Sequence, residues 1–208
     1  MRADTAVLYF VKYPEPGKVK TRLAQSLGAE DAANLYKLIA ERLAAVLADA
    51  ALHRLDVIVT FDPAEREKEV REWLPGHEHY LTQRGAALGE RLHHAFDRAF
   101  SMGYAKVMAL GSDTLELTLK HIIDGRDMLK GKSVVVGPAV DGGYYLIGMS
   151  AFYPEVFVDI PWSTATVFDC TLERLRRNKL TWGLLPMLRD LDEAEDCKNL
   201  NAIIKGKG

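Results

Sequence analysis

The residues of this sequence best suited to bind an anion lie in one short segment, residues 11–23, which reads VKYPEPGKVKTRL. The segment contains four cationic side chains against a single carboxylate, that of Glu15. It is not a Walker A loop, because that motif ends in Gly-Lys-Ser or Gly-Lys-Thr, and here Val19 follows Lys18. Tyr13 also stands where the motif requires its first glycine. The segment therefore argues against a P-loop kinase.

The same segment nevertheless has the composition of a phosphate-binding loop. Two prolines stiffen it, and Gly17 lets the backbone approach a ligand closely. Residues 20–22 are predicted to enter the first turn of a helix, where backbone N–H groups and cations together suit a phosphate. Cations in that turn oppose the helix dipole unless an anion is present, which favours this function over the alternative of solvated surface lysines. Lys20 and Arg22 thereby rank above Lys18, and Lys12 lies at the entrance of the loop.

Asp113 is a candidate metal ligand, because it follows a predicted buried strand. Mg²⁺ in proteins typically takes one or two carboxylates together with phosphate oxygens and water. The alternative is that Asp113 caps a helix, but Thr118 is the better cap for the helix that follows. The acidic segment 190–196, DLDEAED, offers Asp192 as a second metal carboxylate. Asp192 could equally cap a last helix, with Glu195 at the capping-box position.

A glycine-rich segment, GPAVDGGYYLIGM at residues 137–149, holds a third candidate group. Gly142 and Gly143 permit unusual dihedrals and a close approach of the backbone to a ligand. Asp141 is presented just before an apolar strand. The alternative is a simple hairpin turn, since Asp-Gly is a strong hairpin signal, and the spacing by itself slightly favours the turn.

Short apolar runs alternate with helical patterns along the chain, which predicts an α/β fold with one mostly parallel mixed sheet covered by helices on both faces. We expect a single domain over residues 1–208. Ligands of such sheets bind beyond the carboxyl ends of the strands, where Lys12, Asp113 and Asp141 are expected. Strands are predicted at residues 5–11, 55–61, 79–83, 105–113, 133–139, 143–149 and 181–185. Helices are predicted at residues 29–50, 64–74, 88–101, 119–129, 163–178 and 192–204.

The composition narrows the class of protein further. The 27 basic and 29 acidic residues give a net charge near zero, which argues against a nucleic-acid-binding protein. The two cysteines, Cys170 and Cys197, fit no metal or disulfide pattern, so we expect a reducing, cytoplasmic location. No apolar run approaches the ~20 residues that would span a bilayer.

Six segments, taken together and in order, resemble a known family. It is a family of small bacterial proteins of the GT-A fold, in the nucleotide-diphospho-sugar transferase superfamily, provisionally described as glycosyltransferases. The similarity extends over nearly the whole chain. The segments are VKYPEPGKVKTRL, QRGAALGERL, ALGSDTLELT, GPAVDGGYYLIGM, DIPWSTATV and DLDEAED.

The resemblance implies a role for each matching residue. The groups expected to bind the nucleotide and its phosphates are Lys12, Gly17, Lys20, Arg22, Gln83 and Gly89. The expected ligands of a Mg²⁺ or Mn²⁺ ion are Asp113 and Asp192. The residues expected on the sugar or acceptor side are Asp141, Gly142, Gly143, Trp162, Ser163 and Thr164.

These roles imply an enzyme that transfers a sugar from a nucleoside diphosphate sugar to a small acceptor, with Asp141 as catalytic base. A nucleotidyltransferase acting on a triphosphate is the first alternative, since the loop is dense in cations and KTRL is similar to a segment of phospholactate guanylyltransferases. A non-catalytic nucleotide-binding protein is the second, because Thr114, Leu115 and Val140 depart from the family pattern. The expected partners are small molecules, without nucleic acid, and a homo-oligomer is left open.

Overall fold

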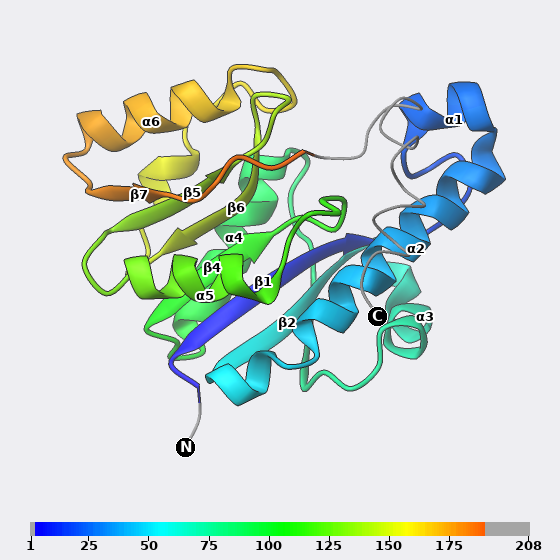
Figure 1. Cartoon of the computed structure of the whole chain (residues 1–208), viewed down its shortest axis with the longest axis horizontal. Helices are drawn as coiled ribbons and strands as arrows, with labels where there is room; N and C mark the ends of the chain where they lie inside the picture. Colours follow the sequence, from blue (N-terminus) through cyan, green and yellow to red (C-terminus); the bar gives the residue numbers. More distant parts are fainter. Residues whose placement is uncertain (1–2, 190–208) are drawn as a thin grey trace.

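Seven strands form one mixed sheet with the order β3-β2-β1-β4-β6-β5-β7 (Figure 1) in the computed structural model, which describes residues 3–189. Only β6 runs antiparallel to its two neighbours, and the other paired strands are parallel. This confirms the predicted mostly parallel mixed sheet. The strands are β1 (Thr5–Lys12), β2 (Leu55–Asp62), β3 (His79–Thr82), β4 (Lys106–Leu110), β5 (Val134–Pro138), β6 (Tyr144–Met149) and β7 (Trp182–Leu184).

Helices cover both faces of the sheet (Figure 1). One face packs against α2, α3 and α5, and the other packs against α4 and α6. The α-helices are α1 (Thr21–Leu27), α2 (Ala29–Leu47), α3 (Glu67–Trp73), α4 (Leu88–Ser101), α5 (Leu119–Met128) and α6 (Val167–Arg177). Three short 3₁₀ helices are η1 (Ala50–His53), η2 (Ala64–Arg66) and η3 (Pro154–Phe157).

Strand β1 shows why a continuous apolar run folds this way. Its side chains alternate between the two cores, because successive residues of a strand point to opposite faces. Val7 and Tyr9 belong to the core under α2 and α5, whereas Ala6 and Leu8 belong to the core under α4. All four residues are fully buried, so β1 is a central strand and requires apolar residues at every position.

The carboxyl ends of the parallel strands meet at one edge of the sheet. Lys12, the last residue of β1, lies opposite Asp62, the last residue of β2. The sheet order reverses between β1 and β4, and such a switch point is the usual ligand crevice of an open α/β sheet. The turn between β5 and β6 lies at the same edge, since β5 is parallel to β4 and β6 returns from it.

Several predicted boundaries differ from the structure. Helix α4 covers the predicted residues 88–101, but the helix predicted over 29–50 ends at Leu47 and is preceded by the separate α1. Helix α6 begins at Val167 rather than at residue 163, and β4 ends at Leu110. Leu38 fits the helical spacing of large apolar residues within the predicted range 29–50, but it is 45% exposed, and Tyr36 is buried instead. The helix predicted over 192–204 lies outside the described residues.

Candidate functional site

An ion pair joins Lys20 of the cationic loop to Asp113. Lys20 Nζ lies 3.1 Å from Asp113 Oδ2. The Lys20 side chain is only 7% exposed, whereas the Asp113 side chain is 38% exposed. Lys20 caps α1 with a left-handed backbone, φ 44°, which is uncommon for a residue other than glycine. The pair therefore connects the loops that follow β1 and β4, at the switch point of the sheet.

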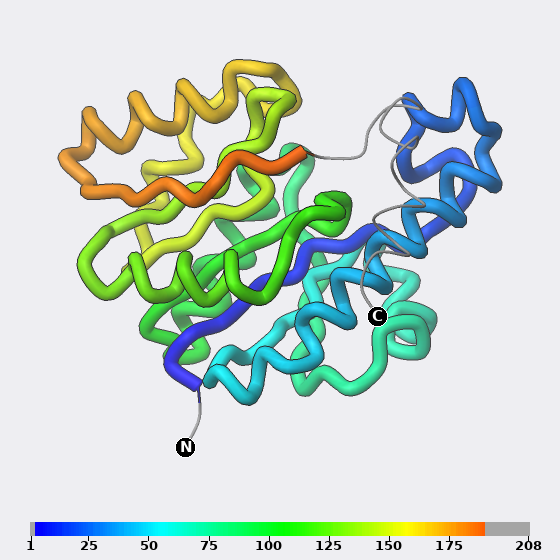
Figure 2. Tube along the Cα trace, viewed as in Figure 1, coloured from blue at the N-terminus to red at the C-terminus, as the bar shows by residue number. Residues whose placement is uncertain are grey.

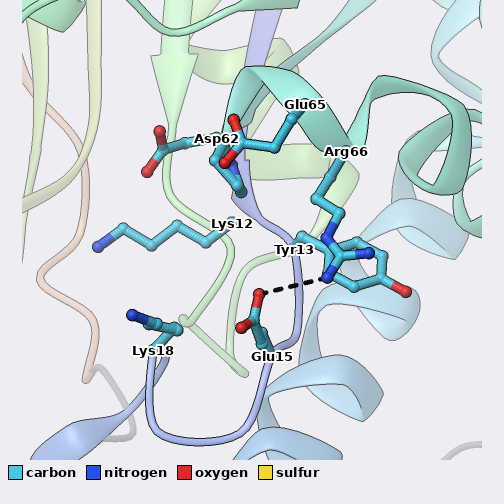
Figure 3. Close-up of a pocket in the computed structure, with 8 residues that line it drawn as sticks. Lys12, Tyr13, Glu15, Lys18, Asp62, Glu65 and Arg66 are labelled. Atoms are coloured by element: carbon cyan, nitrogen blue, oxygen red, sulfur yellow. Dashed lines mark ion pairs between the residues drawn. The ribbon is translucent and has the colours of Figure 1, made fainter.

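A cavity of about 530 Å³ opens at the ends of β1 and β2 (Figure 3). In the figure, the ammonium groups of Lys12 and Lys18 extend toward the same side of the cavity as the carboxylate of Asp62. Cationic and carboxylate side chains are equally represented, so the cavity is polar on most sides. The residues that line it are Lys12, Tyr13, Glu15, Lys18, Asp62, Pro63, Glu65 and Arg66.

One wall of the cavity is held by Arg66. Its guanidinium carbon lies 5.2 Å above the centre of the Tyr13 ring, and its Nη2 lies 3.8 Å from Glu15 Oε2. Arg66 Nη1 also donates to Glu69 Oε1 at 2.8 Å. The pKa of Glu69 is lowered by this hydrogen bond. These contacts orient the first half of the loop against η2 and α3.

The tip of the loop is a turn whose geometry requires Gly17. The N–H of Lys18 donates to the carbonyl oxygen of Glu15 at 3.0 Å, which closes a four-residue turn. Gly17 has φ 77° at the third position, after a proline, and this combination is typical of a type II turn. Gly17 therefore has a structural reason to be glycine, and its contact with phosphate stays a prediction.

Gln83 ties two strand ends together. Its Nε2 donates to the carbonyl oxygens of Val11 and Thr60, both at 3.0 Å, at the ends of β1 and β2. Arg91 Nη1 donates to Gln83 Oε1 at 3.3 Å and to Asp62 Oδ2 at 3.0 Å. The amide of Gln83 is thus fully engaged within the protein. The structure assigns it a supporting position behind the cavity, and direct contact with a nucleotide stays a prediction.

The β5–β6 connection is a hairpin turn that contains Asp141, Gly142 and Gly143. Asp141 is exposed, and its Oδ1 accepts the N–H of Gly143 at 2.8 Å. This confirms the hairpin interpretation. Gly142 packs against the start of α6, since its carbonyl accepts the N–H of Phe168 at 2.9 Å, and Figure 2 shows the two segments beside one another. A methyl group at Gly142 would lie 2.0 Å from the carbonyl oxygen of Ala165.

Trp162, which is predicted on the acceptor side, packs against Gly89 of α4. A methyl group at Gly89 would lie 2.3 Å from Trp162 Nε1, so glycine is needed for the indole to fit there. The Trp162 ring also packs edge-on against Tyr144, with centroids 6.3 Å apart. Ser163 and Thr164 are exposed in the same loop, and Thr164 Oγ1 donates to the Pro161 carbonyl at 2.7 Å.

The predicted residues thus lie at one edge of the sheet in two groups, one at the cavity and one at the β5–β6 hairpin. Lys20 and Asp113 lie at the switch point between β1 and β4. Lys12 and Lys18 line the cavity, whereas the hairpin, Trp162 and Gly89 gather on the side of β6 and α6. Arg22 is exposed on α1 and does not line the cavity. Asp192 lies outside the described residues.

Other residues of the site were not predicted from the sequence. Asp62, Glu65 and Arg66 line the cavity, and Arg91 connects Asp62 to Gln83. The one signal for the first three is their place directly after a predicted strand, which ends at Asp62-Pro63. Arg91 belongs to the segment QRGAALGERL, which the resemblance places beside the nucleoside, but its link between Asp62 and Gln83 was not predicted.

Known proteins confirm the resemblance. The family described as "Uncharacterized protein conserved in bacteria (DUF2064)" matches residues 43–164. The chain belongs to the DUF2064 family. A search of curated proteins found no match.

Solved structures relate this DUF2064 member to nucleotide-dependent transferases. A Desulfovibrio desulfuricans G20 protein, provisionally named a nucleotide-diphospho-sugar transferase, is 36% identical with a TM-score of 0.90, over 99% of this chain and 90% of that chain. The Anaerococcus prevotii 4-diphosphocytidyl-2C-methyl-D-erythritol synthase is 6% identical with a TM-score of 0.61, over 97% of each chain. The Mycobacterium tuberculosis glucosyl-3-phosphoglycerate synthase, solved with Mn²⁺, UDP and glucosyl-3-phosphoglycerate, is 11% identical with a TM-score of 0.51, over 98% of this chain and 76% of that chain.

The two distant likenesses show the fold alone. The fold is therefore one that nucleotidyltransferases and glycosyltransferases share. None of the helices within residues 3–189 is long and apolar enough to cross a membrane.

Proposed function

We propose that this protein is a nucleotide-dependent transferase that moves a glycosyl group from a nucleoside diphosphate sugar to a small acceptor. The observation that carries the proposal is the ion pair between the buried Lys20 and the partly exposed Asp113 at the switch point, together with a cavity that two further lysines line. A lysine this buried is costly unless charged groups surround it, and such arrangements concentrate at functional sites. The 36% identical protein with the same provisional assignment supports it.

In this proposal the cationic loop binds the diphosphate. Within residues 3–189, no ion pair involves Lys12 or Lys18, so both ammonium groups are available to phosphate oxygens. Cations fixed beside the leaving diphosphate stabilise the negative charge that develops as the glycosidic bond breaks. The polar cavity at the ends of β1 and β2, which both lysines line, would hold the diphosphate together with the nucleoside.

Asp113 is suited to bind a divalent cation together with the phosphates. Its side chain is 38% exposed, and one carboxylate is enough for Mg²⁺ when phosphate and water supply the other ligands. Such a cation would supply further charge stabilisation to the leaving group.

The acceptor would lie by the β5–β6 hairpin. Asp141 is exposed there, and its Oδ2 is left to accept a proton while Oδ1 accepts the Gly143 N–H. We propose Asp141 as the base that deprotonates the acceptor hydroxyl. Trp162, with Ser163 and Thr164, would form the opposite wall, because their loop lies against Gly142 at Ala165.

Nucleotidyl transfer is the second candidate, and one observation favours it. Lys12, Lys18 and Lys20 all belong to one loop, and a triphosphate would use three cations better than a diphosphate does. The same site would then join a nucleoside triphosphate to a phosphorylated small molecule and release pyrophosphate.

Two measurements test these proposals. Calorimetric titration with UDP, GDP, CDP and ADP, each with and without Mn²⁺, should find one nucleotide that binds the unsubstituted protein. Lys20→Met should weaken that binding more than tenfold, because a charge-assisted hydrogen bond typically contributes about 1.5–3 kcal/mol. The control is Lys130→Met, since Lys130 is exposed beyond α5 at the other edge of the sheet. Equal affinity in the two variants would refute the proposed site.

Product analysis then separates the two reactions. Incubation with sugar nucleotides should release a nucleoside diphosphate in the presence of candidate acceptors. Incubation with triphosphates and sugar phosphates should release no pyrophosphate. Pyrophosphate release without turnover of any sugar nucleotide would refute glycosyl transfer and support nucleotidyl transfer.

A further inference from the structure

One side chain of α2, that of Tyr36, contacts three segments that carry the candidate phosphate and metal ligands. Its hydroxyl accepts the backbone N–H of Lys12 at 2.8 Å. The same hydroxyl shares a hydrogen bond with Ser112 Oγ at 2.7 Å, directly before Asp113. Tyr36 also belongs to one small core cluster with Ala33 and Val19, which lies between Lys18 and Lys20 and is 3% exposed.

The contacts of Tyr36 are buried and well defined. Tyr36 and Ser112 are each 6% exposed, so water does not compete for their hydroxyl groups. Burial raises the pKa of Tyr36 to about 12, which keeps its hydroxyl protonated at neutral pH. A protonated tyrosine can accept one hydrogen bond and donate another, as this position requires.

We infer that Tyr36 is a positioning residue, which fixes the distance between the cationic loop after β1 and Asp113 after β4. The inference rests on the proposed function. The entrance of the loop is held through Lys12 N–H, its exit through Val19, and the Asp113 loop through Ser112. Fixed charges at fixed distances are what a preorganised polyphosphate site needs, because reorganising them on binding would cost affinity.

A second buried tyrosine provides a matched control. Tyr9 is fully buried on β1, and its hydroxyl donates to the carbonyl oxygen of Ala40 on the same helix at 2.7 Å. It therefore also ties α2 to β1, but its hydroxyl bonds to α2 rather than to Lys12 or Ser112. Removal of either hydroxyl deletes buried hydrogen bonding between the same two elements, and of the two only the Tyr36 hydroxyl bonds to segments that carry candidate ligands.

The test compares Tyr36→Phe with Tyr9→Phe in the full chain. The probes are UDP, GDP, CDP and ADP with their monophosphates, in Mn²⁺, and the base bound most tightly by the unsubstituted protein is used. We expect Tyr36→Phe to weaken diphosphate binding about tenfold and monophosphate binding less than threefold, since the hydroxyl orders the groups that reach the second phosphate. Tyr9→Phe should leave the preference for diphosphate over monophosphate unchanged.

Ser112→Ala is the second variant, because it removes the same bond from the other side. It should lower the preference for diphosphate over monophosphate. The double variant, Tyr36→Phe with Ser112→Ala, should bind the diphosphate no more weakly than whichever single variant binds it less tightly. Equal diphosphate preference in Tyr36→Phe and Tyr9→Phe would overturn this inference and leave the proposed function standing. Failure of the unsubstituted protein to bind any of the nucleotides would overturn both.

Discussion

Replacement of Asp113 by Asn should destabilise the protein more than replacement of Lys20 by Met, although both break the same ion pair. Lys20 is 7% exposed, so Asp113→Asn removes the carboxylate that lies 3.1 Å from a buried ammonium. Lys20→Met puts an apolar side chain of similar length into the same buried space. The Asp113 carboxylate left behind in that variant is 38% exposed and can be hydrated.

The magnitude follows from the geometry. Two unit charges separated by 3.1 Å attract one another by roughly 5 kcal/mol at an effective dielectric constant of about 20. Desolvation of Lys20 and solvent screening of Asp113 offset most of this attraction. We therefore expect Asp113→Asn to lower the free energy of unfolding by about 2 kcal/mol, and Lys20→Met to change it by less than about 1 kcal/mol.

Urea denaturation at pH 7, followed by circular dichroism, measures both variants and the double variant. The double variant should be about as stable as Lys20→Met, because the buried charge is then gone. Both single variants should bind nucleotide weakly although they differ in stability, so the loss of binding can be told apart from the loss of folding free energy. A larger loss of stability for Lys20→Met than for Asp113→Asn would refute the reasoning, since the ammonium would then stabilise the fold independently of this carboxylate.

Three further predictions concern the hairpin, a helix cap and the loop. Gly142→Ala should lower the free energy of unfolding, measured in urea, by more than about 2 kcal/mol, because φ is 87° and the methyl group would lie 2.0 Å from a backbone oxygen. Gly131→Ala is the control and should hardly change it, since no heavy atom lies within 4 Å of the added methyl group. Burial lowers the pKa of His121, whose Nδ1 accepts the backbone N–H of Thr118 at 3.1 Å. The unfolded chain therefore takes up the proton before the folded chain does, and the free energy of unfolding should fall as the pH drops below about 6.5. His121→Gln keeps the capping geometry without titrating, and should flatten this fall in denaturation curves at pH 7 and pH 5. Lys18→Met should weaken calorimetric nucleotide binding more than Arg22→Met does, and the reverse order would place the phosphates at the helix rather than in the cavity.

The sheet and its ligand edge could be predicted because they follow from local pattern and general topology. Apolar runs such as β1 indicate strands buried on both faces, and parallel strands bring their carboxyl ends to one edge. Lys12 and Asp113 therefore reach the same edge whatever the details of packing. The Asp-Gly signal of the hairpin at Asp141 likewise depends on the backbone alone.

The roles of Gln83 and Tyr36 could not be predicted, because their partners are distant in sequence. Gln83 donates to carbonyl oxygens of Val11 and Thr60, which belong to two other strands. Tyr36 shares the buried face of α2 with three small residues, Ala32, Ala33 and Ala40, beside larger apolar ones. The helical spacing of large apolar residues favours Leu38 instead, which is exposed.

The structure also changes which cations of the loop are suited to bind phosphate. The sequence argument ranks Lys20 and Arg22 above Lys18, because the start of a helix should attract an anion. Helix α1 has only seven residues, and Lys20, at its start, is paired with Asp113. Its dipole is therefore small, and part of the Lys20 charge is already neutralised within the protein. A polyphosphate would meet Lys12 and Lys18 first, in the cavity, and would then share the Lys20 ammonium with Asp113 or with a metal bound to Asp113.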